Sequence, residues 1–168
     1  QYTKFKNRLK SFESPHRLPD DVYVQPIGAE IIVIGLGRVG KGAYLSLNSV
    51  VGKKVWGMDA DPTRIMRLEK VGFQAMVGDG EDVDLWENMD LTQIQLILLA
   101  LPSIEDICNI TEQLQHANYI GKIASIARYE DEIQLLIDAG SDKVFNFFTE
   151  AGIGFAEESL QLLPHHSK

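Results

Sequence analysis

The sequence has very little cysteine and no long apolar run. Its one cysteine, Cys108, cannot form an internal disulfide or a cysteine-based zinc cluster, so nothing favours a secreted scaffold over a protein of the reducing cytoplasm. The longest apolar stretch, residues 94–101, contains Gln95 and ends at Pro102. It is far shorter than the ~20 residues that span a bilayer. The four histidines have no metal-ligand spacing with carboxylates, so no metal site is predicted.

Positive charge is scarce outside the first residues. The formal net charge of the chain is −8. Residues 1–17 carry +4, so the other 151 residues together carry −12. A body this acidic repels a phosphate backbone, which argues against nucleic-acid binding. The basic segment suits a juxtamembrane linker beside an anionic membrane surface, and it suits a solvated tail equally well. Because the chain begins with Gln1 rather than Met, we expect it to be part of a longer protein.

Length and composition predict one folded domain. The chain has 168 residues, 45% of them hydrophobic, which is enough for a single core. Residues 1–28 contain three prolines and no sustained apolar period, so they are interpreted as a linker or juxtamembrane tail with one short helix near residues 5–12. The domain is expected over residues 29–163, followed by a flexible C-terminus over residues 164–168.

Strand and helix patterns alternate through the expected domain. Apolar strand patterns occupy residues 31–34, 54–58, 73–77, 94–100, 122–127 and 143–147. Val50 and Val71 complete the apolar stripes of the first two helices, and a last helix is expected over residues 150–163. Such βαβ units predict a doubly wound Rossmann fold, with a six-stranded parallel sheet in the order 3-2-1-4-5-6 and helices on both faces.

A glycine-rich loop follows the first strand. The run Gly35-Leu36-Gly37-Arg38-Val39-Gly40 matches G-x-G-x-x-G, opens a helix, and is followed 19 residues after its last glycine by Asp59 at the end of the next strand. Gly35 would make the tight turn, Gly37 would let backbone N–H groups approach a phosphate, and Gly40 would let the helix pack close to the strand. The helix N-terminus adds partial positive charge, so the pattern predicts a nucleotide site.

Asp59 predicts which nucleotide the site prefers. Its carboxylate would accept hydrogen bonds from both ribose hydroxyls and would oppose a 2′-phosphate, which favours a ligand with a free adenosine diol over one of the NADP type. Asp61, directly before Pro62, is the better helix cap and leaves Asp59 free for the ligand.

Three further residues at the same sheet edge have two interpretations each. Asp79 either faces the adenine or is a turn residue between two glycines. Arg38 either pairs with a phosphate or is a charge on the helix surface. Arg128 either contacts the ligand or a second subunit, or is a solvated loop residue.

These motifs together resemble the TrkA-N domain, also called the regulator of potassium conductance (RCK) N-lobe or KTN domain. The resemblance is carried by the glycine loop, Asp59-Ala60-Asp61, Gly78-Asp79-Gly80 and Ile126-Ala127-Arg128, and it is greatest for the cytoplasmic tails of glutathione-gated potassium/proton antiporters. It implies a homodimer that binds NAD(H), AMP, ADP or ATP and regulates a membrane-embedded potassium transporter or antiporter, expected in the same parent chain. Two departures are Gly80, where the family often has alanine, and the lack of a second lobe after Leu163.

Ten residues are therefore predicted to bind the nucleotide: Gly35, Gly37, Arg38, Val39, Gly40, Asp59, Ala60, Asp79, Gly80 and Arg128. We expect a sensor rather than an enzyme, with the apolar residues 145–163 contributing to the dimer interface or else packing on their own sheet. The alternative is an NAD-dependent oxidoreductase fragment without its substrate domain. The sequence has no serine–tyrosine–lysine spacing of the short-chain dehydrogenase type: Tyr119 and Lys122 lie three residues apart, but they fall at a helix end before the fifth strand, and no serine is suitably placed upstream. A domain that only dimerises would not need three glycines and an acid at these spacings.

Overall fold

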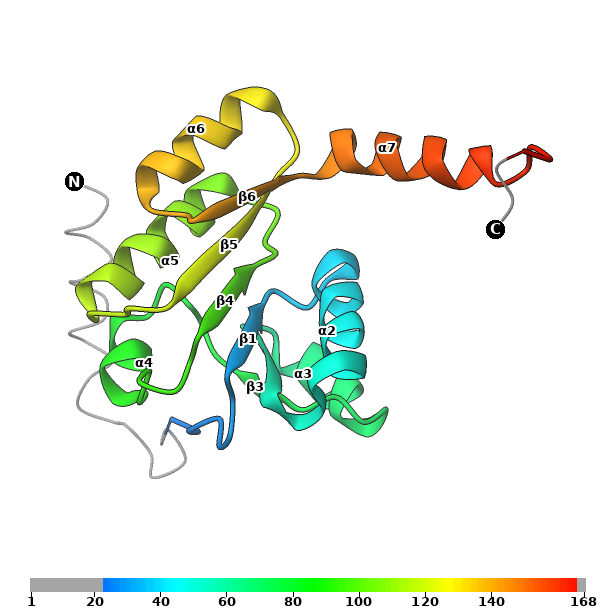
Figure 1. Cartoon of the computed structure of the whole chain (residues 1–168). Coiled ribbons are helices and arrows are strands. Elements are labelled where there is room, and N and C mark those ends of the chain that lie inside the picture. Colours follow the sequence, from blue (N-terminus) through cyan, green and yellow to red (C-terminus); the bar gives the residue numbers. More distant parts are fainter. Residues whose placement is uncertain (1–22, 166–168) are drawn as a thin grey trace.

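Six parallel strands form one sheet in the protein, whose computed structural model describes residues 23–165 (Figure 1). In chain order the strands are β1 Ile31–Ile34, β2 Val55–Asp59, β3 Ala75–Val77, β4 Leu96–Leu99, β5 Lys122–Ala127 and β6 Lys143–Asn146. Their order in the sheet is β3-β2-β1-β4-β5-β6, with every pair parallel. This confirms the predicted doubly wound Rossmann fold.

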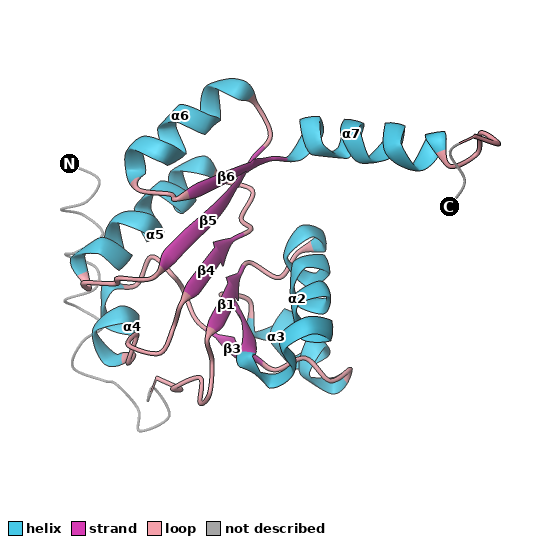
Figure 2. Cartoon of the chain, viewed as in Figure 1, coloured by secondary structure: helices cyan, strands magenta, loops and turns pink. Residues whose placement is uncertain are grey.

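Helices cover both faces of the sheet (Figure 2). The helices are α2 Arg38–Val51, α3 Pro62–Lys70, α4 Val83–Asn88, α5 Ile104–His116, α6 Glu130–Ala139 and α7 Phe147–Leu160, with a short 3-10 turn η3 at Gly52–Lys54. Helices α2 and α3 lie on one face, and α4, α5 and α6 lie on the other. The short helix expected near residues 5–12 lies outside the described residues.

The central strand β1 contributes to a core on each face of the sheet. Ile32 and Ile34 pack into the cluster beneath α4, α5 and α6, whereas Val33 packs into the cluster beneath α2 and α3. All three are at most 2% exposed. A strand buried on both faces has no polar side, which is why β1 is a continuous β-branched run in the sequence.

Two predicted core positions are wrong. Val50 and Val71 are 82% and 73% exposed, because Val50 lies in the last turn of α2 and Val71 lies just beyond α3. The helical spacing of apolar residues continues to the ends of these helices, but these two side chains lie outside the core. The large side chains that these helices do bury are Tyr44 in α2 and Ile65 and Leu68 in α3.

The last helix begins earlier than its sequence pattern predicts. Asn146 caps it by accepting a 3.3 Å hydrogen bond from the backbone N–H of Thr149, so α7 starts at Phe147 and β6 ends one residue before it. The helix extends away from the sheet (Figure 1), and none of its residues is buried. It therefore does not pack on its own sheet, which was one of the two expectations for this region.

The segment that enters β1 is hydrogen-bonded to residues at both ends of α4. The Tyr23 hydroxyl donates a 3.0 Å hydrogen bond to Asp82, the N-cap of α4. Gln25 exchanges two hydrogen bonds with the backbone of Asp90, just beyond the other end of that helix. Within residues 23–165, no helix is long and apolar enough to cross a bilayer.

Replacing Gly40 should strongly destabilise the fold. A Cβ there would overlap the carbonyl oxygen of Gly35, whereas a Cβ at Gly42, in the same helix, would have nothing within 4 Å. We expect Gly40→Ala to lower the free energy of unfolding by about 3 kcal/mol. Gly42→Ala should instead raise it by about 0.5–1 kcal/mol through helix propensity. Urea denaturation of both variants tests this, and equal stabilities would contradict the close approach of loop and helix.

Candidate functional site

A cavity of about 500 Å³ opens where the carboxyl ends of β1, β2 and β4 meet. The strand order reverses at β1, because β2 lies on one side of it and β4 on the other, and ligands of doubly wound sheets bind at such a point. All the predicted site residues except Gly40 line this cavity. Gly40 acts beneath the loop through packing.

The glycine loop contains two glycines that packing requires and one that it does not. Gly35 has φ of +91°, and a Cβ there would lie 2.8 Å from the carbonyl oxygen of Ala100. Gly40 meets the backbone of Gly35 in the same way. A Cβ at Gly37 would have nothing within 4 Å, although Gly37 lines the cavity. No contact within the described chain therefore explains a glycine at position 37.

The N-terminus of α2 has no side-chain cap. Gly37 is the N-cap residue, so no side chain accepts a hydrogen bond from the first amides, and the first turn contains no acidic residue. Gly37, Arg38 and Val39 all line the cavity. Their position gives that wall of the cavity a partial positive charge and hydrogen-bond donors suited to an anion.

Asp59 connects the end of β2 to the glycine loop. It is 7% exposed, and its Oδ2 accepts a 2.8 Å hydrogen bond from the backbone N–H of Leu36 and a 3.0 Å bond from Nη1 of Arg64. Its Oδ1 accepts a 2.9 Å bond from the N–H of Asp61. Burial raises the pKa of Asp59, but the hydrogen bonds and the Arg64 charge outweigh burial and bring the pKa below its usual value.

The expectation that Asp59 is left free must be corrected. Asp61 does cap α3, accepting hydrogen bonds from the backbone N–H groups of Thr63 and Arg64. Asp59 nevertheless has three donors of its own: the backbone N–H groups of Leu36 and Asp61 and the guanidinium of Arg64. A ligand hydroxyl would have to share or replace one of these hydrogen bonds.

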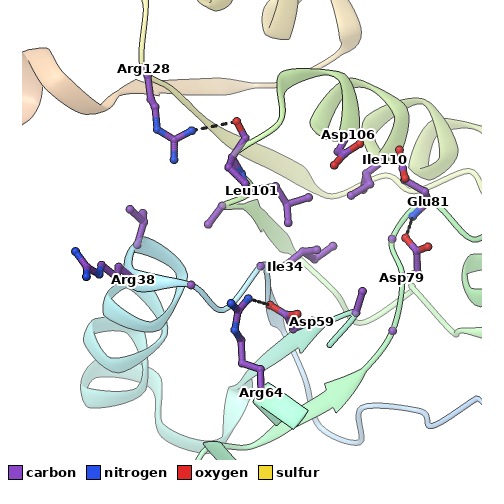
Figure 3. A pocket seen from close by; sticks show the side chains of 18 residues that line it. Ile34, Arg38, Asp59, Arg64, Asp79, Glu81, Leu101, Asp106, Ile110 and Arg128 are labelled. Carbon is purple, nitrogen blue, oxygen red and sulfur yellow. Dashed lines mark hydrogen bonds and ion pairs between the residues drawn. The ribbon is translucent and has the colours of Figure 1, made fainter. Parts of the chain in front are cut away.

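Opposite sides of the cavity carry opposite charge (Figure 3). Arg38 and Arg128 lie on one side, and Asp79, Glu81 and Asp106 lie on the other. Arg38 is exposed and forms no ion pair with any described residue.

Arg128, which directly follows β5, and the carboxylates of the cavity are partly held by hydrogen bonds within the chain. Arg128 donates a 3.1 Å hydrogen bond to the carbonyl oxygen of Pro102, so it also braces the loop after β4. Asp79 accepts a hydrogen bond from the N–H of Glu81, as a turn residue does. Burial, together with the neighbouring Glu81 carboxylate, raises the pKa of Asp106. Both interpretations of Arg128 and Asp79 thus remain compatible with where they lie.

The model of the TrkA-N domain family matches residues 31–147, well over half of the chain. The chain belongs to the TrkA-N domain family. Its relatives include the glutathione-regulated potassium-efflux system protein KefC of Cronobacter sakazakii, 31% identical over 101 residues that cover 60% of this chain and 16% of KefC. The Ktr system potassium uptake protein C of Bacillus subtilis is 32% identical over 72 residues, 43% of this chain and 32% of that protein. The chain thus matches only a minor part of each relative.

Solved structures share the fold of this TrkA-N domain. The NAD(P)-binding domain of an exopolyphosphatase-related protein from Archaeoglobus fulgidus superposes with a TM-score of 0.73 at 23% identity, covering 79% of this chain and 98% of that one. The Kef CTD of Shewanella denitrificans in its AMP-bound form gives 0.64 at 21%, covering 80% of each chain. The GsuK channel bound to NAD gives 0.60 at 18%, covering 83% of this chain and 25% of that one.

Sequence reasoning missed several residues in the wall of the TrkA-N cavity. Ala100, Leu101, Pro102 and Ile110 provide its apolar part, and Arg64, Glu81 and Asp106 are the missed charged groups. Arg64 contacts Asp59 directly. The one sequence signal for Arg64 is its position in the first turn of the helix that follows Asp59, which places it at the same edge of the sheet.

Asp59→Asn should lower stability and flatten its dependence on acid pH. An amide at this position replaces one acceptor oxygen by a donor, so the free energy of unfolding at pH 7 should fall by about 1–3 kcal/mol. Because the pKa of Asp59 is lowered by folding, its stabilisation is present above about pH 4 and is lost as the pH falls through the folded-state value. Urea denaturation between pH 7 and pH 2 measures both effects. An equally steep acid loss in the variant would show that Asp59 is not a source of it.

Proposed function

We propose that this TrkA-N domain binds an adenine nucleotide in the cavity and serves as a sensor, not as a catalyst. The observation that carries the proposal is Gly37, which lines the cavity at the N-terminus of α2 and has open space where a Cβ would lie. A glycine without an internal packing reason, beside uncapped helix amides, suits the close approach of a phosphate.

The charges of the cavity fit the parts of such a ligand. A phosphate sits at the start of α2, with Arg38 as its pairing cation. The ribose hydroxyls reach Asp59 at the end of β2, which favours a free 2′-hydroxyl over a 2′-phosphate. The adenine lies toward Asp79, where carboxylate oxygens can accept a hydrogen bond from its amino group.

The neighbours support an adenosine phosphate but leave its identity open. One is an AMP-bound Kef domain and another is a channel bound to NAD, and both ligands contain adenosine 5′-phosphate. We propose that this shared moiety is what the cavity recognises. The potassium-efflux and potassium-uptake relatives support a role in regulating potassium transport. The transporter would be a membrane domain, in the same parent chain, with this domain at its cytoplasmic face.

The chemistry of the cavity wall supports a sensor over an oxidoreductase. Among the described residues, its lining contains no serine, tyrosine, histidine or lysine, so carboxylates are the only groups there that could move a proton to or from an alcohol. Tyr119 and Lys122 lie outside the lining, and the Tyr119 hydroxyl donates to the carbonyl oxygen of Lys122. Burial raises the pKa of Tyr119 to about 12, which makes its phenol a poor acid at neutral pH.

Gly37→Val tests the binding site directly. Valine fits the open space and the extended backbone at this position, so the variant should fold with a Tm within about 3 °C of the wild type. It should lose AMP and NAD binding in calorimetric titrations, because the side chain fills the phosphate position. Gly42→Val is the matched control, since Gly42 also has open space but lies outside the cavity lining. Retained binding in Gly37→Val would place the phosphate elsewhere.

We further propose that the sensor works as a homodimer through α7. Several large apolar side chains are exposed at the end of the described chain: Phe145, Phe148, Ile153, Phe155, Leu160, Leu162 and Leu163. The ring of Phe148 lies beside the rings of Tyr129 and Phe147, and it is 53% exposed. An apolar helix that leaves its own sheet uncovered needs a partner surface, and a second copy supplies the same surface in return.

Replacing Phe148 and Phe155 together by Asp should convert the dimer to a monomer. The two rings are 53% and 77% exposed in the single chain, so the change should not disturb its core. Met66→Asp, at a 58% exposed position in α3, is the control and should remain dimeric. Sedimentation velocity at micromolar concentration measures all three proteins. A wild type that stays monomeric at high micromolar concentration would refute the dimer.

A further inference from the structure

Donors of the chain and the hydroxyls of the proposed ligand compete for the same carboxylate oxygens of Asp59. A carboxylate oxygen has two lone pairs, and Oδ2 already accepts from Leu36 and Arg64. Among the described residues, Oδ1 accepts only from the N–H of Asp61, which leaves it one acceptor position. A ribose whose two hydroxyls donate to both oxygens must therefore displace one donor from Oδ2.

Arg64 is the donor that can give way. Leu36 uses its backbone N–H and is 0% exposed in the core, so its hydrogen bond is fixed by the fold. The side chain of Arg64 is 39% exposed and can move into the cavity or into water. Figure 3 shows its guanidinium extending from α3 to Asp59 at the edge of the cavity, away from Asp79, Glu81 and Asp106.

The Arg64–Asp59 pair also changes the charge that a ribose would meet. Asp59 alone would repel a 2′-phosphate, but an arginine 3.0 Å away neutralises most of that charge at short range. Once displaced from Oδ2, the guanidinium remains beside the ribose. Guanidinium groups bind phosphate through charge-assisted and bidentate hydrogen bonds.

We propose that Arg64 is the specificity-determining residue for the ribose 2′ substituent: it yields Oδ2 to a ribose hydroxyl and pairs with a 2′-phosphate when one is present. The proposal rests on the proposed adenine-nucleotide site. Asp59 creates a preference for a free 2′-hydroxyl over a 2′-phosphate. Arg64, the ion-pair partner of Asp59, keeps that preference small because it attracts the phosphate. Removing Arg64 should therefore make the site more selective against 2′-phosphates, not less.

Calorimetric titration of the full chain with AMP and with adenosine 2′,5′-bisphosphate isolates this effect, because the two ligands differ only at the 2′ position. In Arg64→Gln, the ratio of the bisphosphate Kd to the AMP Kd should rise about tenfold, the size expected for one lost charge-assisted hydrogen bond. AMP itself should bind as tightly as to the wild type or more tightly. Arg67→Gln is the matched control, because Arg67 is an exposed arginine of the same helix outside the cavity lining and its ratio should not change.

Each other outcome has a defined meaning. An unchanged ratio in Arg64→Gln, or an equal loss of both ligands, would overturn the role of Arg64 while leaving the nucleotide site intact. A wild type that binds neither ligand would instead refute the proposed function. Arg64→Met serves if the glutamine variant fails to fold, and it should give the same rise, whereas Arg64→Lys should keep the ratio within about threefold of the wild type.

Discussion

The hydrogen bond from the Leu36 amide to Asp59 is the constraint on which the site depends. It spans 23 residues and joins the loop after β1 to the end of β2. Two further backbone bonds reinforce the joint, from the N–H of Gly35 to the carbonyl of Met58 and from the N–H of Gly78 to that of Asp59. The carboxyl ends of β1, β2 and β3 are thus fixed to one another before any ligand enters. Asp59 is consequently both a structural acceptor and the group that the proposed ribose would meet.

Much of this arrangement could be predicted from the sequence, because the features that decide it are local. Buried parallel strands read as continuous apolar runs, and Gly35 and Gly40 are needed where backbone approaches backbone. Asp61 before Pro62 identified the start of α3 for the same reason, since capping involves only neighbouring residues.

The features that the sequence did not reveal depend on contacts between elements. The exposure of Val50 depends on where the sheet ends beneath α2, and the spacing of one helix contains no information about that. Arg64 is one of many arginines in helices, and only the geometry of β2 and α3 aims it at Asp59. The start of α7 was misplaced because Phe147 was assigned to the preceding strand pattern, and the cap that Asn146 provides to Thr149 was not recognised.

The distribution of charge and apolar surface suggests how binding could reach the rest of a larger protein. The cavity separates cationic from acidic side chains, so a ligand that spans it would contact the loops after β1, β3 and β5 at the same time. The loop after β3 is hydrogen-bonded to the segment entering β1 through Asp82 and Tyr23, and β6 continues directly into α7. One route leads from the cavity to the segment that enters β1, and the other leads to the exposed apolar surface of α7.

The most direct test of the account is an NMR titration of the ¹⁵N-labelled chain with AMP. Binding at the glycine loop should shift the backbone amides of Gly37, Arg38 and Val39, together with that of Leu36, whose hydrogen bond to Asp59 would feel the ribose. The amides of η3 and of the β-strand ends remote from the cavity should not move. Saturable shifts confined to the loop and to the ends of β2 and β3 are the predicted result. Shifts elsewhere with an unperturbed glycine loop, or no shifts at millimolar AMP, would contradict it.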